Sequence, residues 1–247
     1  MHSHVVPFIF ASGHGTRLRP LTESTPKPLL PVRGEKTIID LTIENLLAHG
    51  FSTVFVNYSY GEEHFTALKK KYASRISITL VDDQEVCGQG GILVKTRDAL
   101  QATPYVLCLN GDTVIDFDLD TFVHNPQPSE IRLLSDDSKP VIRNLLCDSK
   151  GIVYGRHTTD DTSEINWYEQ TDVELSQHNY LGVSLIPTAP LSHVTMPTPF
   201  MGFFGEGELI EQYYAQHVRS RIESVAITQY QTANTAEELT ALRAALQ

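Results

Sequence analysis

Cysteine is scarce in this sequence, which has only Cys87, Cys108 and Cys147 among its 247 residues. An odd number without paired spacing indicates neither a disulfide framework nor a zinc site, so we expect reduced thiols and a cytoplasmic protein. Long apolar runs are also lacking, because none approaches the roughly 18 residues that a membrane span needs. The short apolar stretch over residues 5–11 has no basic segment before it and is typical of a buried strand, not of a signal peptide.

Positive charge is in short supply too, with 19 lysines and arginines against 30 aspartates and glutamates. A formal net charge of −11 argues against a nucleic-acid partner, because a phosphate backbone requires a basic surface. One segment reverses this balance. Residues 17–36 contain two glutamates against the basic residues Arg17, Arg19, Lys27, Arg33 and Lys36. The sequence therefore favours a small anionic ligand that binds near this segment.

Apolar runs alternate with helical patterns in the first half of the chain. We expect strands over residues 5–11, 54–57, 76–81 and 105–110, and helices over residues 38–49, 62–72 and 92–100. Strands that alternate with helices predict a mainly parallel sheet with helices on both faces, which is a Rossmann-like three-layer α/β/α fold. Pro7 cannot donate to a sheet ladder and is expected at the beginning of its strand.

The second half changes character from about residue 116. We expect strands over residues 131–134, 152–154, 180–186 and 221–227, and helices over residues 208–217 and 236–246. We interpret this half as a mixed, partly antiparallel extension of the same central sheet. The prediction is a single domain over residues 1–247, in which two halves meet near residue 115.

A glycine-rich loop follows the first predicted strand, with the sequence Ala-Ser-Gly-His-Gly-Thr-Arg-Leu-Arg-Pro-Leu-Thr over residues 11–22. Open α/β sheets bind their ligands at this end of a strand. Gly13 and Gly15 permit positive φ angles, so successive backbone N–H groups can point at one anion. Thr16 can add a hydroxyl donor, and Arg17 a planar guanidinium that suits phosphate oxygens.

Lys27 stands between Pro26 and Pro28, which hold the backbone extended and limit where the ammonium group can go. A Gly-x-Gly alone is more often a turn than a phosphate site. The loop also lacks the Gly-Lys-Ser/Thr of a P-loop and the third glycine of a dinucleotide fingerprint. The length of the pattern, together with Pro-Lys-Pro, makes it specific.

Two further sites carry polar groups. Asp112 follows Asn110 and Gly111 at the end of the predicted strand over residues 105–110, beside the predicted phosphate site. A carboxylate placed there is suited to hold Mg²⁺ together with substrate oxygens, although an aspartate in a simple turn is the alternative. In the turn over residues 88–91, Gln89 could read the edge of a nucleobase, and tight packing at a helix start is an equally good interpretation.

Residues 11–32 resemble the signature of the sugar-phosphate nucleotidyltransferases, which is Gly-x-Gly-Thr-Arg-Leu-x-Pro-Leu-Thr, three residues, and Pro-Lys-Pro-Leu-Leu-Pro-Val. The chain is similar to the short branch of this family, without the left-handed β-helix that many relatives add. That branch includes N-acetylmuramate 1-phosphate uridylyltransferases and heptose or mannose 1-phosphate guanylyltransferases. The resemblance implies an enzyme that joins a nucleoside triphosphate to a sugar 1-phosphate and releases pyrophosphate, as a monomer or small homo-oligomer.

The resemblance also implies roles for individual residues. Arg17 and Lys27 would be catalytic, Asp112 would bind Mg²⁺, and the sugar phosphate would contact Lys27, Glu169 and Asn179. The nucleotide-binding residues would be Ala11, Ser12, Gly13, His14, Gly15, Thr16, Arg17, Gln89, Gly90 and Asn110.

The sequence departs from the family pattern at two positions. Thr232 stands where the family has a second metal-binding aspartate, and a neutral hydroxyl is a poor replacement for that ligand. Gln170 stands where many relatives have the lysine that holds the sugar phosphate. Candidates for the missing positive charge are Arg143, Arg156 and His178.

Two other functions remain open at this point. The departures at Thr232 and Gln170 are compatible with a non-catalytic regulatory protein that binds nucleotide sugars. A glycosyltransferase of similar fold would use a metal-binding Asp-x-Asp, and Asp116, Asp118 and Asp120 match that spacing. Neither alternative requires both Arg17 and Lys27, so transfer of a nucleotide is the favoured hypothesis.

Overall fold

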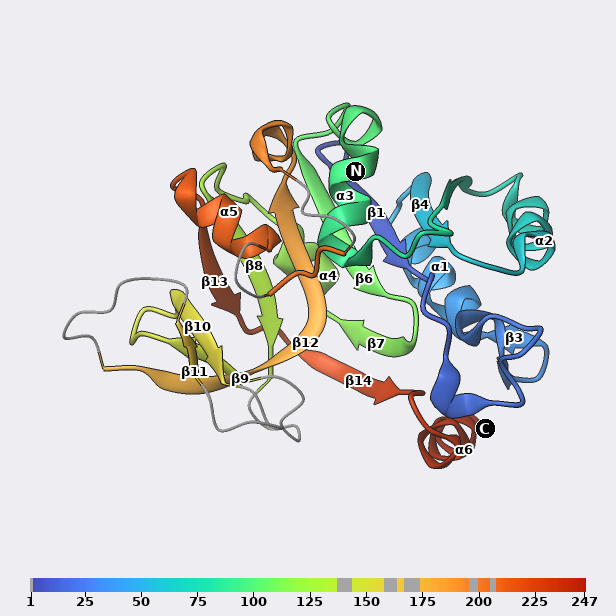
Figure 1. The fold of residues 1–247 in the computed structure, drawn as a ribbon. Helices are drawn as coiled ribbons and strands as arrows, with labels where there is room; N and C mark the ends of the chain where they lie inside the picture. Colours follow the sequence, from blue (N-terminus) through green and yellow to red (C-terminus); the bar gives the residue numbers. More distant parts are fainter. Residues whose placement is uncertain (1, 137–143, 158–163, 167–173, 196–199, 205–207) are drawn as a thin grey trace. The chain divides into compact units, whose positions relative to one another are not determined.

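The computed structural model describes residues 2–136, 144–157, 164–166, 174–195, 200–204 and 208–247 (Figure 1). Contacts between residues divide the chain into two compact units. The first contains Met1–Val86, Leu109–Leu119 and Ile227–Gln247, and the second contains Cys87–Cys108 and Asp120–Ala226. The units do not follow chain order, because the C-terminal segment groups with the N-terminal one. That residues 1–247 form a single domain stays a prediction.

Parallel strands form the sheet of the first unit. β1 (Val5–Phe10) pairs with β4 (Thr53–Tyr58), which pairs with β5 (Ser77–Asp82). Helix α1 (Ile38–Ala48) precedes β4, and α2 (Glu62–Tyr72) joins β4 to β5, as the alternating pattern predicts for a parallel sheet. Figure 1 shows β1 and β4 side by side, in the colours of the N-terminal residues.

Two antiparallel ribbons complete the first unit. One joins β2 (Pro31–Arg33) to β3 (Lys36–Thr37), and the other joins β7 (Thr113–Phe117) to β14 (Ile227–Thr232). Helix α6 (Ala236–Ala245) follows β14 and buries Leu239 and Leu242 in an apolar cluster. The other buried members of that cluster are Leu18, Leu30, Val32, Ile38, Val114 and Ala233. This packing joins the C-terminal helix to the segment that carries the glycine-rich loop.

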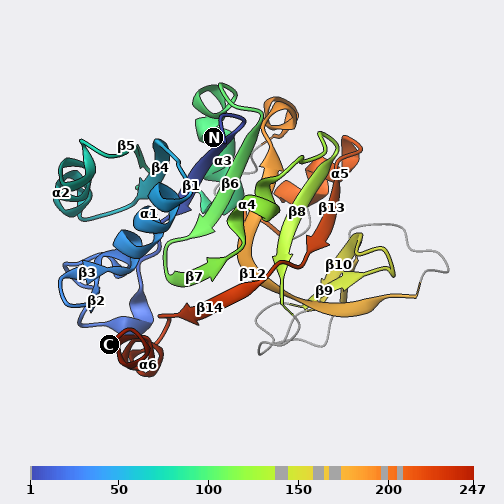
Figure 2. The ribbon, with the colours of Figure 1, turned by 180° about the vertical axis from the view of Figure 1, so that it is seen from behind.

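The second unit is built on a mixed set of strands. β12 (Ser176–Pro187) pairs antiparallel with β8 (Glu130–Ser135) and with β9 (Asn144–Cys147). β8 also pairs parallel with β13 (Arg219–Glu223), so that β8 lies between β12 and β13 (Figure 2). An antiparallel ribbon continues from β9; it consists of β10 (Val153–His157) and β11 (Glu164–Asn166).

Helices α3 (Gly88–Leu100) and α5 (Leu209–Ala215) belong to the second unit, as does α4 (Leu119–Val123) apart from its first residue. β6 (Tyr105–Asn110) has its first four residues in the second unit and its last two in the first. Within the described ranges, no helix is both long and apolar enough to cross a lipid bilayer. The three cysteines, all within the described ranges, are buried and form no disulfide bond, and burial raises the pKa of the Cys108 thiol to about 12.

Most predicted elements are confirmed, including α2 and β6 at their predicted bounds. The strand predicted over residues 221–227 is wrong. β13 ends at Glu223, where it pairs with β8 of the second unit, and β14 begins at Ile227, where it pairs with β7 of the first. The apolar pattern runs through the boundary between the units, so sequence periodicity cannot separate the two strands.

Two smaller expectations also need correction. Pro7 is the third residue of β1 and not its first, but the ladder with β4 begins at Phe8, so the missing N–H of proline precedes those pairs. Helix α3 begins at Gly88, four residues before the predicted start. Its early N–H groups have a backbone acceptor, because Gly90 and Gly91 both donate to the carbonyl of Met201.

The N-terminus of α1 contains a buried carboxyl group. Asp40 Oδ2 accepts hydrogen bonds from the N–H and the hydroxyl of Thr37, and Thr37 Oγ1 accepts from the Asp40 N–H, which forms a capping box. Lys71 Nζ donates to Asp40 Oδ1 at 2.8 Å. Burial by itself raises the pKa of Asp40, but the hydrogen bonds from Lys71 and Thr37 outweigh it and leave the pKa lowered.

We therefore predict that Asp40→Ala lowers the free energy of unfolding by about 2 kcal/mol at neutral pH, because a cap and a buried acceptor are lost. Because the folded pKa of Asp40 is below the unfolded one, this contribution is present above the unfolded pKa and disappears as the pH falls through the folded value. Urea unfolding at neutral and acidic pH should show the two proteins converging in acid. Lys71→Ala, which removes a half-exposed partner, should have the smaller effect. A constant difference across pH would contradict this role of Asp40.

Candidate active site

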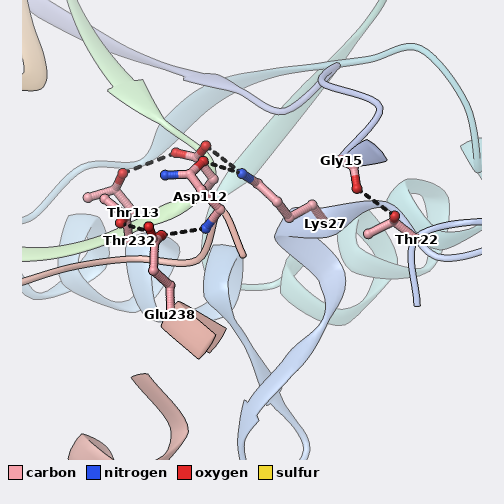
Figure 3. A network of polar contacts seen from close by, with 8 residues as sticks. Gly15, Thr22, Lys27, Asp112, Thr113, Thr232 and Glu238 are labelled. Atoms are coloured by element: carbon pink, nitrogen blue, oxygen red, sulfur yellow. Dashed lines mark hydrogen bonds and ion pairs between the residues drawn. The ribbon is translucent and has the colours of Figure 1, made fainter. Parts of the chain in front are cut away.

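The glycine-rich loop leaves β1 and turns at Gly15. Gly15 has φ +58°, a left-handed conformation that a side chain rarely adopts. A Cβ atom there would lie 3.0 Å from Thr22 Cγ2 and 3.2 Å from Lys27 Cβ, so the loop packs closely on the following segment. Thr22 Oγ1 donates to the Gly15 carbonyl at 2.8 Å, which fixes the turn (Figure 3). The short helix η1 (Thr16–Leu18) follows directly.

Side chains at the end of β4 hold the beginning of the loop. Asn57 Oδ1 accepts from the Ala11 N–H at 2.7 Å, and Asn57 Nδ2 donates to Ser12 Oγ and to Asp83 Oδ2, each at 3.0 Å. Ser59 Oγ donates to the Ser12 carbonyl. Asn57 and Asp83 are fully buried, with 1 % and 0 % of their surface exposed. The backbone at residues 11–12 is therefore fixed before the loop reaches solvent.

The rest of the loop is open. Gly13, His14, Thr16 and Arg17 are exposed. Because Arg17 is exposed, an anion in solvent can reach its guanidinium. The His14 ring stacks on Tyr60, with ring centroids 5.7 Å apart, and Tyr60 donates its hydroxyl hydrogen to the Thr22 carbonyl.

Lys27 points away from Gly15 and toward Asp112 (Figure 3). It opens the short helix η2 (Lys27–Leu29), and its Nζ donates to Asp112 Oδ2 at 2.7 Å and to Asn234 Oδ1 at 2.9 Å. Its side chain is 11 % exposed, against 30 % for that of Asp112. The structure therefore brings together the predicted catalytic lysine and the predicted metal ligand.

Asp112 is placed by the turn between β6 and β7. The Gly111 N–H donates to the Phe10 carbonyl at 2.9 Å, and the Ala233 N–H donates to the carbonyl of Asp112 at 3.1 Å. These bonds hold the turn to the end of β1 and to the residue after β14. Thr113 Oγ1 donates to Asp112 Oδ1 at 3.1 Å, so both carboxylate oxygens have a donor. Asn110, a predicted nucleotide contact, ends β6 two residues before Asp112.

The segment after β14 supplies groups that sequence reasoning missed. Asn234 contacts Lys27 directly, and Glu238 Oε2 accepts from Thr232 Oγ1 and from the Asn234 N–H, each at 2.7 Å (Figure 3). Thr232, which replaces the aspartate of the family pattern, thus hydrogen bonds to a carboxylate. The sequence signal for these groups is the polar run over residues 232–238, in which the prediction concerned the replacement of an aspartate by Thr232 and did not include Asn234 or Glu238.

The remaining predicted residues lie in the second unit or outside the described residues. Gln89 and Gly90 are in the first turn of α3, where a Cβ atom on Gly90 would lie 2.3 Å from the Gly202 carbonyl oxygen. This close approach fits the packing interpretation of the turn, and its contact with a nucleobase stays a prediction. Asn179 is buried on β12, and its Nδ2 donates to the Asp136 carbonyl at 3.4 Å. Glu169 lies outside the described residues.

The structure describes the side chain of one of the three candidates for replacing the charge lost at Gln170. His178 on β12 contacts Ser176 Oγ through its Nε2 at 2.9 Å. Arg156 lies on β10, and Arg143 is outside the described residues. The role of each of these three residues in binding a sugar phosphate stays a prediction.

Asp112 is suited to a magnesium ion bound in part by substrate. Its carboxylate oxygens are hard donors, and the side chain is partly exposed. Across the residues that the structure describes, no group of three or more His, Cys, Asp or Glu side chains could hold a metal. The donor set therefore fits an ion that keeps several waters and takes phosphate oxygens, as Mg²⁺ does, and does not fit an all-protein cage.

The contacts of Asn57 lead to a prediction on stability. Asn57→Ala removes the acceptor of the Ala11 N–H and one donor to the buried Asp83, and should lower the free energy of unfolding by about 3 kcal/mol. Asn45→Ala is the matched control, because Asn45 donates only to the exposed Asp116 and its loss should change stability by less than about 1 kcal/mol. Urea unfolding measures both. Equal effects would show that the buried network does not hold the loop.

Comparison with known proteins gives a consistent family. The sequence model of the Nucleotidyl transferase family matches residues 6–134. A UTP–glucose-1-phosphate uridylyltransferase from Synechocystis sp. is 30 % identical over 177 residues, which cover 66 % of this chain and 43 % of that protein. A mannose-1-phosphate guanylyltransferase catalytic subunit beta from Drosophila pseudoobscura pseudoobscura is 36 % identical over 112 residues, covering 44 % and 30 %. The chain therefore matches less than half the length of these curated relatives.

Solved structures share the fold over almost the whole chain. HddC from Yersinia pseudotuberculosis has a TM-score of 0.73 at 16 % identity, covering 98 % of this chain and 99 % of that one. A putative glucose-1-phosphate thymidylyltransferase from Bacillus anthracis has a TM-score of 0.71 at 17 % identity, covering 98 % and 95 %. The predicted Rossmann-like α/β class with a mixed central sheet is confirmed. Because the family match covers more than half of the 247 residues, this chain belongs to the nucleotidyl transferase family.

Proposed function

We propose that this protein transfers a nucleoside monophosphate from a nucleoside triphosphate to a sugar 1-phosphate and releases pyrophosphate. The observation that carries the proposal is the meeting of Lys27 with Asp112, next to a loop that exposes Arg17. The curated relatives are named for glucose 1-phosphate and mannose 1-phosphate, and these names support a sugar phosphate as the acceptor.

The loop supplies the triphosphate site in this proposal. The backbone at Ala11 and Ser12 is fixed by Asn57, so binding of an anion need not order the start of the loop. Backbone N–H groups of residues 13–17 would then donate to phosphate oxygens, and the Arg17 guanidinium would add two parallel donors. Arg17 would neutralise charge that develops on the leaving pyrophosphate.

Lys27 would act between donor and acceptor. The second pKa of a phosphate monoester is about 6, so a sugar 1-phosphate is mostly a dianion at neutral pH and needs no general base. The barrier is then repulsion between two anions, which a positioned cation reduces. Lys27 is a largely buried cation in the segment after the loop, with 11 % of its side chain exposed. Its ammonium group would contact oxygens of both the acceptor phosphate and the α-phosphate.

Mg²⁺, the cofactor that we propose, would be held by Asp112 and would withdraw charge from the phosphate oxygens when bound. The ion pair with Lys27 gives Asp112 a second task. In the ligand-free protein, Lys27 neutralises this carboxylate, and phosphate oxygens can replace the carboxylate as partners of the ammonium when substrates bind.

The other two hypotheses have less support. Asp116, the first aspartate of the Asp-x-Asp spacing, is on β7, where it accepts hydrogen bonds from Asn45 and Thr228 within the surface of the first unit. These contacts account for Asp116 without a metal. The non-catalytic alternative rests on Thr232 and Gln170, and no comparison favours it.

The roles proposed for Arg17 and Lys27 give a prediction on catalysis. Lys27→Gln and Arg17→Gln should each lower the rate of pyrophosphate release at least ~100-fold, because charge neutralisation in the transition state is lost. Lys36→Gln is the matched control, since Lys36 lies in the same basic segment but pairs with Glu44 on the surface, and its rate should stay near that of the wild type. The assay uses mixed sugar 1-phosphates, all four triphosphates and Mg²⁺. Wild-type rates in either catalytic variant would refute its assigned role.

Specificity for the base can be measured by thermal shift. A ligand that binds the folded state stabilises it by mass action, by about 2.7 kcal/mol at a hundred times its Kd, so the preferred triphosphate should give the largest rise in Tm. Asp112→Asn should remove the part of that rise that depends on Mg²⁺ and leave the metal-free part. If no triphosphate raises the Tm of the wild type, the protein does not bind the proposed donor.

A further inference from the structure

Lys27 has two hydrogen-bond partners, and one of them, Asn234, carries no charge. Its Nζ donates to Asp112 Oδ2 at 2.7 Å and also to Asn234 Oδ1 at 2.9 Å, from a residue 207 positions away in the sequence. An ammonium group has three N–H donors, so these two acceptors leave one for a ligand. A single ion pair lets a flexible lysine pivot about its acceptor, whereas two acceptors fix the direction of the third N–H bond.

Asn234 is itself held in place. Its backbone N–H donates to Glu238 Oε2 at 2.7 Å, and the same oxygen accepts from Thr232 Oγ1. On the other side, the Ala233 N–H donates to the Asp112 carbonyl. The turn that carries Asn234 is thus fixed both to helix α6 and to the residue that forms the ion pair with Lys27.

Glu238 does more than cap its helix. Thr235 is the N-cap of α6 and accepts from the Glu238 N–H at 3.2 Å. In a capping box the acidic side chain would return to the N–H of the N-cap residue itself. Here the carboxylate reaches one residue further, to the N–H of Asn234. The Thr235 side chain therefore caps the start of α6, and the Glu238 side chain holds the turn at Asn234.

We propose that Asn234 is a positioning residue for Lys27 and that Glu238 positions Asn234 through its backbone. A neutral amide oxygen orients the ammonium group and leaves its charge intact, so Lys27 keeps both its direction and its charge when Asp112 exchanges partners. The consequence for catalysis rests on the proposed function. The orientation of Lys27 without substrate is independent of the proposed function.

The test measures the reactivity of Lys27 in the ligand-free protein. A water-soluble N-hydroxysuccinimide acetate acylates lysines, and peptide mass spectrometry gives the ratio of the Lys27 rate to the Lys36 rate in the same molecule. Asn234→Ala and Glu238→Ala should each raise this ratio about fivefold, since the first removes an acceptor of Lys27 and the second removes the group that holds Asn234 in place. Glu238→Gln keeps an acceptor for the Asn234 N–H and should restore the wild-type ratio.

Thr235→Ala is the matched control, because it weakens the start of α6 and leaves the contact between Asn234 and Lys27 intact. Its ratio should match that of the wild type. A ratio that rises as much in Thr235→Ala as in Glu238→Ala would overturn the proposal, because the effect would then come from the stability of the helix. Unchanged ratios in Asn234→Ala and Glu238→Ala would overturn it as well.

Turnover gives a second, separate readout. Asn234→Ala should lower kcat of pyrophosphate release about tenfold and leave KM for the triphosphate within about twofold, because orientation acts on the transition state. Asn234→Asp keeps an acceptor but adds a negative charge, and should lower kcat without raising the acylation ratio. If the ratios change as expected and the wild type releases no pyrophosphate, the proposed function fails and the positioning role stands.

Discussion

The ion pair between Lys27 and Asp112 is the constraint on which the candidate site depends. It joins the segment after the glycine-rich loop to the turn after β6, across 85 positions of sequence. A lysine side chain that is only 11 % exposed requires a partner, because burying an unpaired charge is strongly unfavourable. Lys27 and the turn that carries Asp112 therefore depend on each other, and the hydrogen bond to Asn234 connects the segment after β14 to the same ammonium group.

Lys27 and Asp112 neutralise each other in this structure. In the proposed reaction, phosphate oxygens would replace Asp112 as partners of the ammonium group, and a divalent ion would replace Lys27 as the partner of the carboxylate. Asn234 would continue to accept a hydrogen bond from Lys27. The loop needs little reorganisation, since Asn57 and Thr22 already fix both ends of its turn.

Local sequence patterns were sufficient to predict the elements that position the loop. Alternating apolar and helical segments gave β1, β4, β6 and α2, and Gly-x-Gly with Pro-Lys-Pro gave the family. The pattern did not reveal the partners of Lys27, because Asp112 and Asn234 are 85 and 207 positions away and only the fold brings them together. β14 was missed for a related reason: the apolar pattern crosses from one unit into the other between Glu223 and Ile227.

The most direct test of the account is a crystal structure with a non-hydrolysable triphosphate, Mg²⁺ and a sugar 1-phosphate. We expect phosphates along residues 13–17, with Arg17 on the terminal phosphates and Lys27 Nζ in contact with an oxygen of the α-phosphate. Asp112 should contact the metal ion. A nucleotide bound away from this loop, with Lys27 still paired to Asp112 and Arg17 in solvent, would contradict the account.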